Sequence, residues 1–468
     1  MWAVSCVEKR VRFAIRLLFC CFVIMVLHAL ATSTGDNKNM SFGQRDAAEE
    51  CVKKVYQAVE DRYYDASFHG IDLKARAKEA KDRIAKVQTL SEGYGVIAWM
   101  LDGLNDSHTF FLPPRRPYDV DYGWEFGFVG DKCYIIAVRP ESDVFKQGIK
   151  PGDELMSLEG FTVTRENFWK LQYAFEVLAP RSGIHMILRS PDGNTRTTLV
   201  NAKVEKLAKQ LDIFGPGEWF RSKDIGRLWE PRVVEMGDDL MIWKLLRFNI
   251  SEGEVDKYIR QARKHGGLIL DLRGNPGGGE LILSRLLALV FDRDVIVGDK
   301  IQRHQTKPWK VKSRGAASTY SGRLLVLIDS QSASAAEIFA RVTQIEKRAL
   351  VLGDRSAGMV MESRHSYFSA GQFDPIVAGV SITEADLLMT DGKSLEHAGV
   401  NPDKVVLPTP EDLARDRDPT LALATAELGV QLRPEQAGKL FLPFGGPTDS
   451  VVLATDYPPV SSRISCTV

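Results

Sequence analysis

The segment Leu324-Leu-Val-Leu-Ile328 is followed directly by Asp329-Ser-Gln-Ser-Ala-Ser-Ala-Ala-Glu337, a strand–turn–helix pattern that is typical of α/β folds. The apolar run predicts a buried strand, and the segment from Ala335 to Lys347 predicts a helix. A serine on the turn between them projects from the sheet edge, where unpaired N–H groups of the helix point outward and suit a developing oxyanion. Because Ser334-Ala-Ala-Glu337 also fits a capping box, this turn alone does not establish a nucleophile.

A second turn of the same kind lies upstream. The buried strand Gly267-Leu-Ile-Leu-Asp-Leu272 and the helix from Leu281 to Phe291 flank the turn Asp271-Leu-Arg-Gly-Asn-Pro-Gly-Gly-Gly279. Consecutive glycines let a backbone approach a ligand closely and turn its N–H groups toward an anion, although a turn that only needs positive φ has the same composition. Two such turns on successive strand–helix units predict a site at one edge of a sheet.

The wider pattern divides the chain into regions. Alternating strands and helices over 206–428 predict an α/β core, in which strand–helix units form a mixed sheet. Apolar residues at helical spacing predict an N-terminal helical segment over 45–115, and short strands with turn signals predict a small β-rich domain over 122–205. The remaining residues, 429–468, form a C-terminal extension whose role the sequence does not indicate.

The N-terminus has the order of a secretory signal peptide. A basic start precedes the apolar run Leu17 to Leu27, and the small-x-small site Ala29-Leu30-Ala31 follows. We therefore expect residues 1–31 to be removed and the protein to be secreted or periplasmic. The apolar run is shorter than the roughly 20 residues of a membrane span, but an uncleaved N-terminal anchor is the alternative.

Composition excludes several classes of function. Lys+Arg and Asp+Glu both total 61, so a neutral chain of 468 residues has no electrostatic reason to bind nucleic acid. There is no zinc-type Cys/His spacing and no phosphate-binding GxxxxGK[ST] loop, so we expect neither metal nor cofactor. After removal of the signal peptide, three cysteines remain, which are Cys51, Cys133 and Cys466. They are too few and too widely spaced for a disulfide framework, although one bridge is possible. The oligomeric state is not indicated.

Two motifs together resemble a known family. Arg273-Gly-Asn-Pro-Gly-Gly278, followed later by Ser332-Ala-Ser-Ala-Ala-Glu337, resembles the hallmark pair of the C-terminal processing (tail-specific) serine proteases. The resemblance covers roughly 45–406 and implies a crotonase-like core, an inserted PDZ-like domain and polypeptide substrates. It also implies that Ser334 is the nucleophile, with an oxyanion hole formed by the N–H of Ala335 and one from Gly277-Gly278.

At the position of the general base, this chain differs from the better-known members of the family, which carry a lysine where this chain has Met359. A thioether cannot take a proton from serine. A branch resembling tricorn protease uses histidine instead, and Ser107-His108 and Glu396 are similar to its motifs. The resemblance to that branch implies that His108 is the base near pH 7, that Ser107 orients it and that Glu396 supports the site. A catalytically inactive peptide-binding protein is the alternative, since the lysine is lost.

The β-rich region has its own signature. Gly123-Trp-Glu-Phe-Gly-Phe128 resembles the carboxylate-binding turn and strand of PDZ domains, and Gly148-Ile-Lys-Pro-Gly-Asp153 resembles their later turn. A PDZ domain adds an extended peptide as an extra strand, so the resemblance implies that Gly127 and Phe128 contact peptide. A generic small β domain is the alternative.

Overall fold

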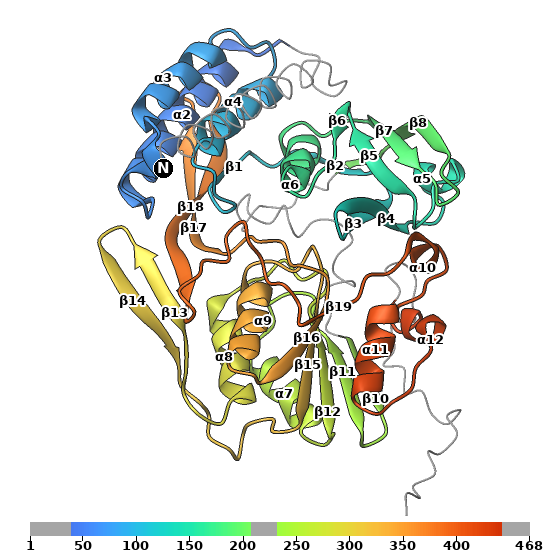
Figure 1. Cartoon of the computed structure of the whole chain (residues 1–468). Helices are drawn as coiled ribbons and strands as arrows, with labels where there is room; N and C mark the ends of the chain where they lie inside the picture. Colours follow the sequence, from blue (N-terminus) through green and yellow to red (C-terminus); the bar gives the residue numbers. More distant parts are fainter. Residues whose placement is uncertain (1–38, 207–231, 442–468) are drawn as a thin grey trace, which may run out of the picture.

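A computed structural model describes residues 39–206 and 232–441. The expected signal peptide, residues 1–31, and Cys466 lie outside these ranges. Figure 1 shows an α-helical body and a small β-rich body side by side above a larger α/β core. Within the described ranges, none of the helices has both the length and the apolar character that crossing a bilayer requires.

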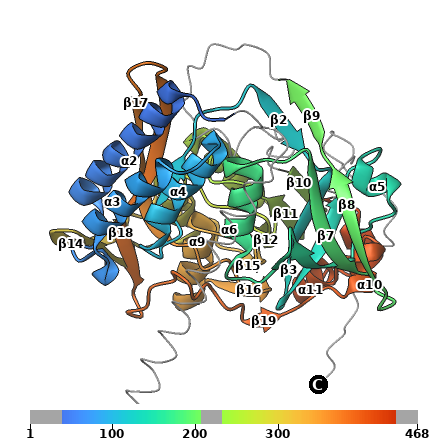
Figure 2. The same ribbon diagram turned by 90° about the horizontal axis from the view of Figure 1, so that it is seen from above.

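The N-terminal helices pack on a long β-hairpin from the second half of the chain. Their bounds are α2 (Phe42–Arg62), η1 (Phe68–Gly70), α3 (Leu73–Ile84) and α4 (Leu90–Asp102). Side-chain caps start α2, α3 and α4 at Ser41, Asp72 and Thr89. Figure 2 shows these helices lying along the hairpin. The helical segment is therefore joined to a sheet rather than standing alone.

That sheet has the order β1-β18-β13-β14, with β17 on the other edge of β18. Its strands are β1 (Phe110–Leu112), β13 (Val295–Gln302), β14 (Gln305–Val311), β17 (Met361–Ala370) and β18 (Ile376–Met389). The sequence analysis did not identify its two hairpins. β1 pairs with β18 with Phe110 opposite Ser381, and this pairing fixes the loop that precedes β1 against a strand far away in the sequence.

The β-rich body has its own sheet and core. Its elements are β3 (Trp124–Val129), β4 (Lys132–Val138), α5 (Asp143–Lys146), β5 (Glu154–Leu158), β6 (Phe161–Thr162), α6 (Phe168–Gln172), the π-helical turn η2 (Tyr173–Leu178), β7 (Gly183–Arg189) and β8 (Thr195–Asn201). β7 and β8 form an antiparallel hairpin. The antiparallel pair β2 (Tyr118–Asp121) and β9 (Lys203–Lys206) brings the two ends of this body together.

The core sheet has the order β10-β11-β12-β15-β16-β19, antiparallel at β10 and otherwise parallel. Its strands are β10 (Arg232–Met236), β11 (Leu240–Lys244), β12 (Gly267–Asp271), β15 (Arg323–Ile328), β16 (Ala349–Gly353) and β19 (Lys404–Val405). The predicted mixed sheet is therefore confirmed. Because β12 and β15 are parallel neighbours, the glycine turn and the serine turn lie at the same edge, as predicted.

Helices cover both faces of this sheet. Their bounds are α7 (Glu252–Ala262), α8 (Glu280–Val290), α9 (Ala335–Ile345), α10 (Pro410–Ala414), α11 (Pro419–Glu427) and α12 (Pro434–Gly438). One apolar cluster includes side chains of α7, α8 and α9, and a second on the other face includes side chains of α11 and α12. The strand ends between these layers are rigidly held, which suits them to carry a site.

Candidate active site

The serine turn holds Ser334 in an uncommon conformation. Ser334 precedes α9 with φ 54° and ψ −119°, and it is half-buried. A non-glycine residue in such a conformation costs about 1–3 kcal/mol and persists only where the surroundings hold it. Here its N–H faces two acceptors, Met359 O at 2.9 Å and Glu337 Oε2 at 3.0 Å. The backbone of the predicted nucleophile is therefore fixed from two sides.

The glycine turn packs directly against Ser334. A Cβ on Gly277 would lie 2.6 Å from the Cβ of Ser334 and 3.0 Å from the nitrogen of Ala335, so only glycine fits at this position, where φ is +98°. The N–H of Gly277 donates to Asn275 Oδ1 at 2.8 Å. Within the described residues, the N–H groups of Gly278 and Ala335 have no acceptor, which leaves these two as donors for a ligand.

A hydrogen-bonded chain connects the other three predicted residues. His108 Nδ1 lies 2.7 Å from Ser107 Oγ, and Ser107 Oγ donates to Glu396 Oε2 at 3.0 Å. The N–H of Ser107 donates to Glu396 Oε1 at 2.7 Å. Since the Ser107 proton is directed to the carboxylate, its oxygen accepts from Nδ1–H, and this tautomer leaves Nε2 of His108 as a proton acceptor.

Asp106 holds the loop that carries His108. The Asp106 carboxylate is buried and accepts from the N–H groups of His108 (2.9 Å) and Thr109 (2.7 Å) through Oδ1. The hydroxyls of Thr383 and Tyr63 also donate to it, each at 2.7 Å. The sequence analysis did not single out Asp106, because its partners lie on distant elements.

One short segment connects the serine turn to the histidine chain. The carbonyl of Met359 accepts from the Ser334 N–H, and the next residue, Val360, donates its N–H to Glu396 Oε2 at 2.8 Å. Met359 thus contributes through its backbone. Among the described residues, no hydrogen bond joins His108 to Ser334. Such bonds are often long in a resting enzyme and tighten when substrate binds.

Burial shifts the pKa values of this chain of groups. Desolvation lowers the pKa of His108 below its ordinary value of 6.5; the charge of Asp106 opposes this shift, and the charge of His365 adds to it. Desolvation raises the pKa of Glu396, although His397 and the hydrogen bonds from Ser107 and Val360 oppose the shift. His365 lies on β17 and belongs to no motif that the sequence analysis identified.

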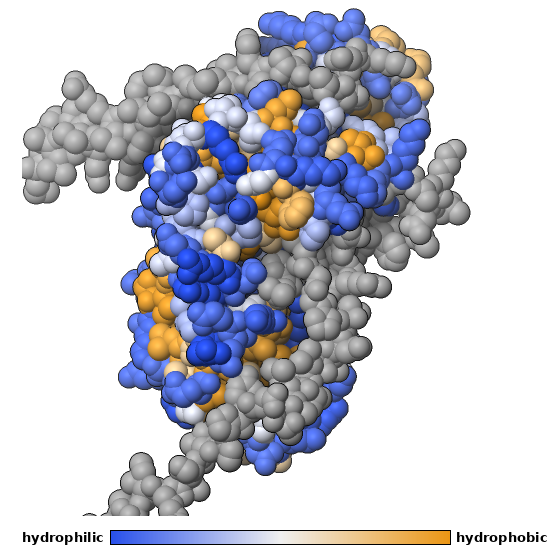
Figure 3. Space-filling view, turned by 90° about the vertical axis from the view of Figure 1, so that its right-hand side faces the viewer, coloured by the Kyte–Doolittle hydropathy of each residue, from blue (hydrophilic) through white to orange (hydrophobic). Residues whose placement is uncertain are grey.

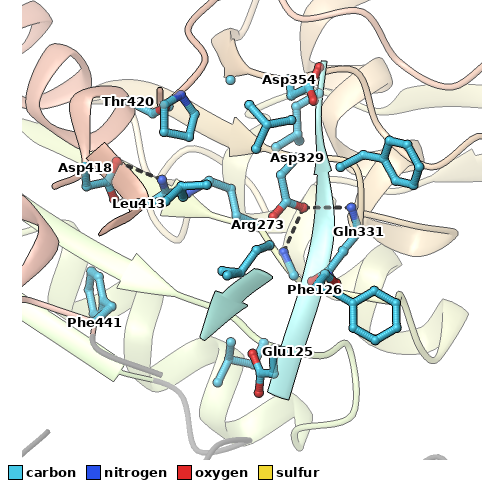
Figure 4. A pocket seen from close by; sticks show the side chains of 18 of the residues that line it. Glu125, Phe126, Arg273, Asp329, Gln331, Asp354, Leu413, Asp418, Thr420 and Phe441 are labelled. Carbon is cyan, nitrogen blue, oxygen red and sulfur yellow. Dashed lines mark hydrogen bonds and ion pairs between the residues drawn. The ribbon is translucent and has the colours of Figure 1, made fainter. Parts of the chain in front are cut away.

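A cavity of about 540 Å³ lies beside the serine turn, between β3 and the carboxyl ends of the core strands. Figure 4 shows Phe126 of β3 next to Gln331 and Asp329 of the turn, with Arg273 and Asp418 further along the wall. Figure 3 views the molecule from the right-hand side of Figure 1 and shows patches of apolar surface between hydrophilic areas on that face. The cavity is therefore lined both by the β-rich body and by the first residues of the serine turn, while Ser334 and His108 are not among its lining residues.

The turn also holds β3 directly. The hydroxyl of Ser330 accepts from the N–H of Phe128 at 3.0 Å and donates to its carbonyl at 2.7 Å. The Gln331 amide donates to the carbonyl of Phe126 at 2.8 Å and would lie 3.0 Å from a Cβ on Gly127. The two residues predicted to contact peptide, Gly127 and Phe128, therefore face the turn that precedes Ser334.

The predicted disulfide candidates remain reduced where they are described. Cys51 and Cys133 are both buried and unbonded. Desolvation raises the pKa of each thiol, so neither is a reactive thiolate near neutral pH.

A serine on a strand–helix turn, free N–H donors beside it and a nearby histidine chain define the class of serine hydrolases. Comparison with known proteins narrows this class. Residues 241–406 match the model of peptidase family S41. The carboxyl-terminal-processing protease of Picosynechococcus sp. is 24% identical over 76% of this chain and 83% of its own length. The chloroplastic carboxyl-terminal-processing peptidase 2 of Arabidopsis thaliana is 24% identical over 79% and 72%, respectively.

Solved structures agree on the fold. The crystal structure of mature CPAF superposes with a TM-score of 0.59 at 18% identity, covering 79% of this chain and 94% of that one. The fold is therefore that of the S41 proteases, with mixed sheets and helices. The chain is a serine-type peptidase that is similar to the carboxyl-terminal-processing proteases, and peptides or proteins are its substrates.

Proposed function

We propose that this chain is an exported serine endopeptidase in which Ser334 is the nucleophile and His108 the general base. The observation that carries the proposal is the hydrogen-bonded chain from His108 through Ser107 to Glu396, connected through Val360 and Met359 to the Ser334 turn. This hydrogen-bonded chain leaves Nε2 of the His108 imidazole without a proton, which is the state that a general base requires.

The proposed reaction proceeds in two stages. Ser334 Oγ attacks the carbonyl carbon of the scissile bond while its proton passes to His108 Nε2. The N–H groups of Gly278 and Ala335 stabilise the oxyanion, and Gly277 shapes the turn beside them. The imidazolium then gives its proton to the leaving amine, and water hydrolyses the acyl-enzyme by the same route. Ser107 and Glu396 keep the imidazole in the required tautomer and stabilise its charge.

The β-rich body is proposed to be a PDZ-like domain that grips the polypeptide. The sequence resemblance, the strand β3 and the cavity along it support this role, with Gly127 and Phe128 in contact with peptide. Because Ser330 and Gln331 occupy backbone groups of Phe128 and Phe126, an added peptide strand has to replace these contacts. We further propose a domain limit of 122–205 and a crotonase-like core over 206–428.

Export is proposed from the sequence of residues 1–31, which lie outside the described ranges. The relatives include a chloroplastic processing peptidase. An N-terminal leader that directs the chain across a membrane agrees with such a processing role.

Labelling with a fluorophosphonate probe tests the catalytic proposal, because only an activated serine reacts. We expect the wild-type chain to label and to cleave unstructured peptides, and Ser334→Ala to lose both activities. His108→Ala should lower the rate by about 10²–10⁴-fold, the usual contribution of general-base catalysis.

The matched control is His185→Ala, because His185 is an exposed histidine on β7, away from this site. It should label and cleave like the wild type. If His108→Ala kept the wild-type rate, the base would have to be another residue, and an unlabelled wild-type chain would instead favour an inactive peptide-binding protein.

A further inference from the structure

Glu337 is a carboxylate in the core of the protein, one helical turn after Ser334. Its side chain is fully buried, with 0% exposure. Among the described residues it has no cationic partner, and all four of its recorded hydrogen-bond donors are neutral. A buried carboxylate without a counter-charge is costly, so its hydrogen bonds need to be good ones.

The four donors come from two separate parts of the chain. Oε2 accepts from the N–H of Ser334 and from the N–H of Met359, each at 3.0 Å. Oε1 accepts from the hydroxyl of Ser356 at 2.6 Å and from the N–H of Gly358 at 2.7 Å. One side chain therefore joins the serine turn to the segment 356–359.

Of these four bonds, a capping box uses only the one from the Ser334 N–H to the Glu337 side chain. The three further bonds have no role in starting the helix α9, and they use both oxygens fully. A glutamine at this position has one acceptor oxygen and would place an NH₂ group against two donors. The four donors thus fit a carboxylate and do not fit a glutamine amide, which has the same shape.

This bridge, made by the Glu337 side chain, fixes two backbone segments that the reaction needs. It holds the N–H of Ser334, whose positive φ orients the hydroxyl and the following N–H of Ala335. It also holds Met359, whose neighbour Val360 donates to Glu396 in the histidine chain. Glu337 and Glu396 therefore bind three successive N–H groups, those of Gly358, Met359 and Val360.

We propose that Glu337 is a positioning residue, which holds Ser334 and the Ala335 N–H in reactive geometry and fixes them relative to the His108 chain. The inference rests on the proposed function of Ser334 and His108. Glu337 acts only through the backbone and does not touch the substrate. Desolvation raises the pKa of Glu337 to about 7, and the four hydrogen bonds from neutral donors oppose this shift by stabilising the carboxylate.

The test is Glu337→Gln in the full chain, with kcat and KM measured separately on an unstructured peptide. We expect kcat to fall by about 10²-fold, as for a displacement of reacting groups by about an ångström, while KM stays unchanged. Fluorophosphonate labelling of Ser334 should slow in parallel. The control is Thr343→Val, because Thr343 is buried on the same helix and bonds only to its carbonyls, so it should lower stability without changing kcat.

A second variant covers the case in which Glu337→Gln does not fold. Ser356→Ala removes one donor to Oε1, together with the acceptor of the Val400 N–H, and should lower kcat by roughly threefold to tenfold, as for the lost hydrogen bond to Glu337, at unchanged KM. Unchanged kcat in both variants, or a fall in kcat no larger than that of Thr343→Val at equal loss of stability, would overturn the positioning role. Failure of the proposed function itself would be seen separately, as a wild-type chain that neither labels nor cleaves.

Discussion

The pKa of His108 determines how the proposed peptidase responds to pH. Only the neutral imidazole accepts the serine proton, and desolvation lowers its pKa below 6.5, more than Asp106 raises it. A histidine base with an ordinary pKa would give activity that rises through about pH 6–7. We now expect kcat/KM to rise with pH through a midpoint below 6.5, measured on the free enzyme with a dilute peptide. A midpoint above 6.5 would contradict the assignment of His108.

His365 provides a matched variant for this prediction. Its positive charge lowers the pKa of His108, so His365→Ala should move the midpoint of the pH profile upward, while His185→Ala should not. The lowered pKa of His108 also makes the stability of the folded state depend on pH. Since the folded state binds the proton of His108 more weakly than the unfolded state, stability should rise with pH from the lowered pKa up to about 6.5.

At the residue scale, motif spacing identified groups whose roles depend on neighbours in the sequence. Ser334 and His108 could be selected in this way, since each lies in a short motif. Asp106 and His365 could not, and Glu337 was identified only as the capping residue of the serine motif. Each of these acts through partners far along the chain, such as Thr383 for Asp106, and a single sequence does not reveal such contacts.

At the scale of elements, the contact between β3 and the serine turn leads to a binding prediction. Ser330 occupies both the N–H and the carbonyl of Phe128, the groups that a peptide strand needs. Ser330→Ala should free them and tighten peptide binding by roughly fivefold to tenfold, in line with about 1 kcal/mol per hydrogen bond. Fluorescence anisotropy with a labelled peptide on the Ser334→Ala background would measure this.

The control for this variant is Ser318→Ala, because Ser318 lies in a turn of the core and its only recorded bond is made by its backbone. It should leave the affinity unchanged. Equal affinity of Ser330→Ala and wild type would mean that peptide does not add to β3 at Phe128.

Elements with a strong apolar period were predicted well, and elements without one were missed. The strands β12 and β15 are continuous apolar runs, and α9 begins where the turn predicts, although it ends at Ile345 rather than Lys347. The hairpin β17–β18 was not predicted. Its first strand is exposed or half-exposed at most positions and is stabilised by pairing with β18 and by contact with α2. Such stabilisation comes from tertiary packing, which local pattern does not encode.

At the scale of the whole molecule, the candidate site is assembled from parts that lie far apart in the sequence. His108 follows the N-terminal helices, Ser334 lies on the turn between β15 and α9 of the core, and Glu396 follows β18. The pairing of β1 with β18 brings the histidine loop beside Glu396. The order of modules could be read from the sequence, but this long-range pairing could not, because a few residues of β1 carry no information about their partner strand.

The arrangement of modules allows the β-rich body to be removed as a unit. β2 and β9 pair with Asp121 opposite Lys203, so a short linker between these residues can replace the body, whose core is largely its own. We expect this excision to lower cleavage of long peptides by at least tenfold more than hydrolysis of a small activated ester. Only the long substrate is proposed to add as a strand to β3. Some loss of ester hydrolysis is also expected, since Ser330 and Gln331 lose their partners on β3.

A Ser330→Ala/Gln331→Ala variant is the control for the excision, because it breaks those contacts and keeps β3. If the excised chain lost both activities equally, or lost no more than this control, the body would act by supporting the serine turn and not by gripping the polypeptide.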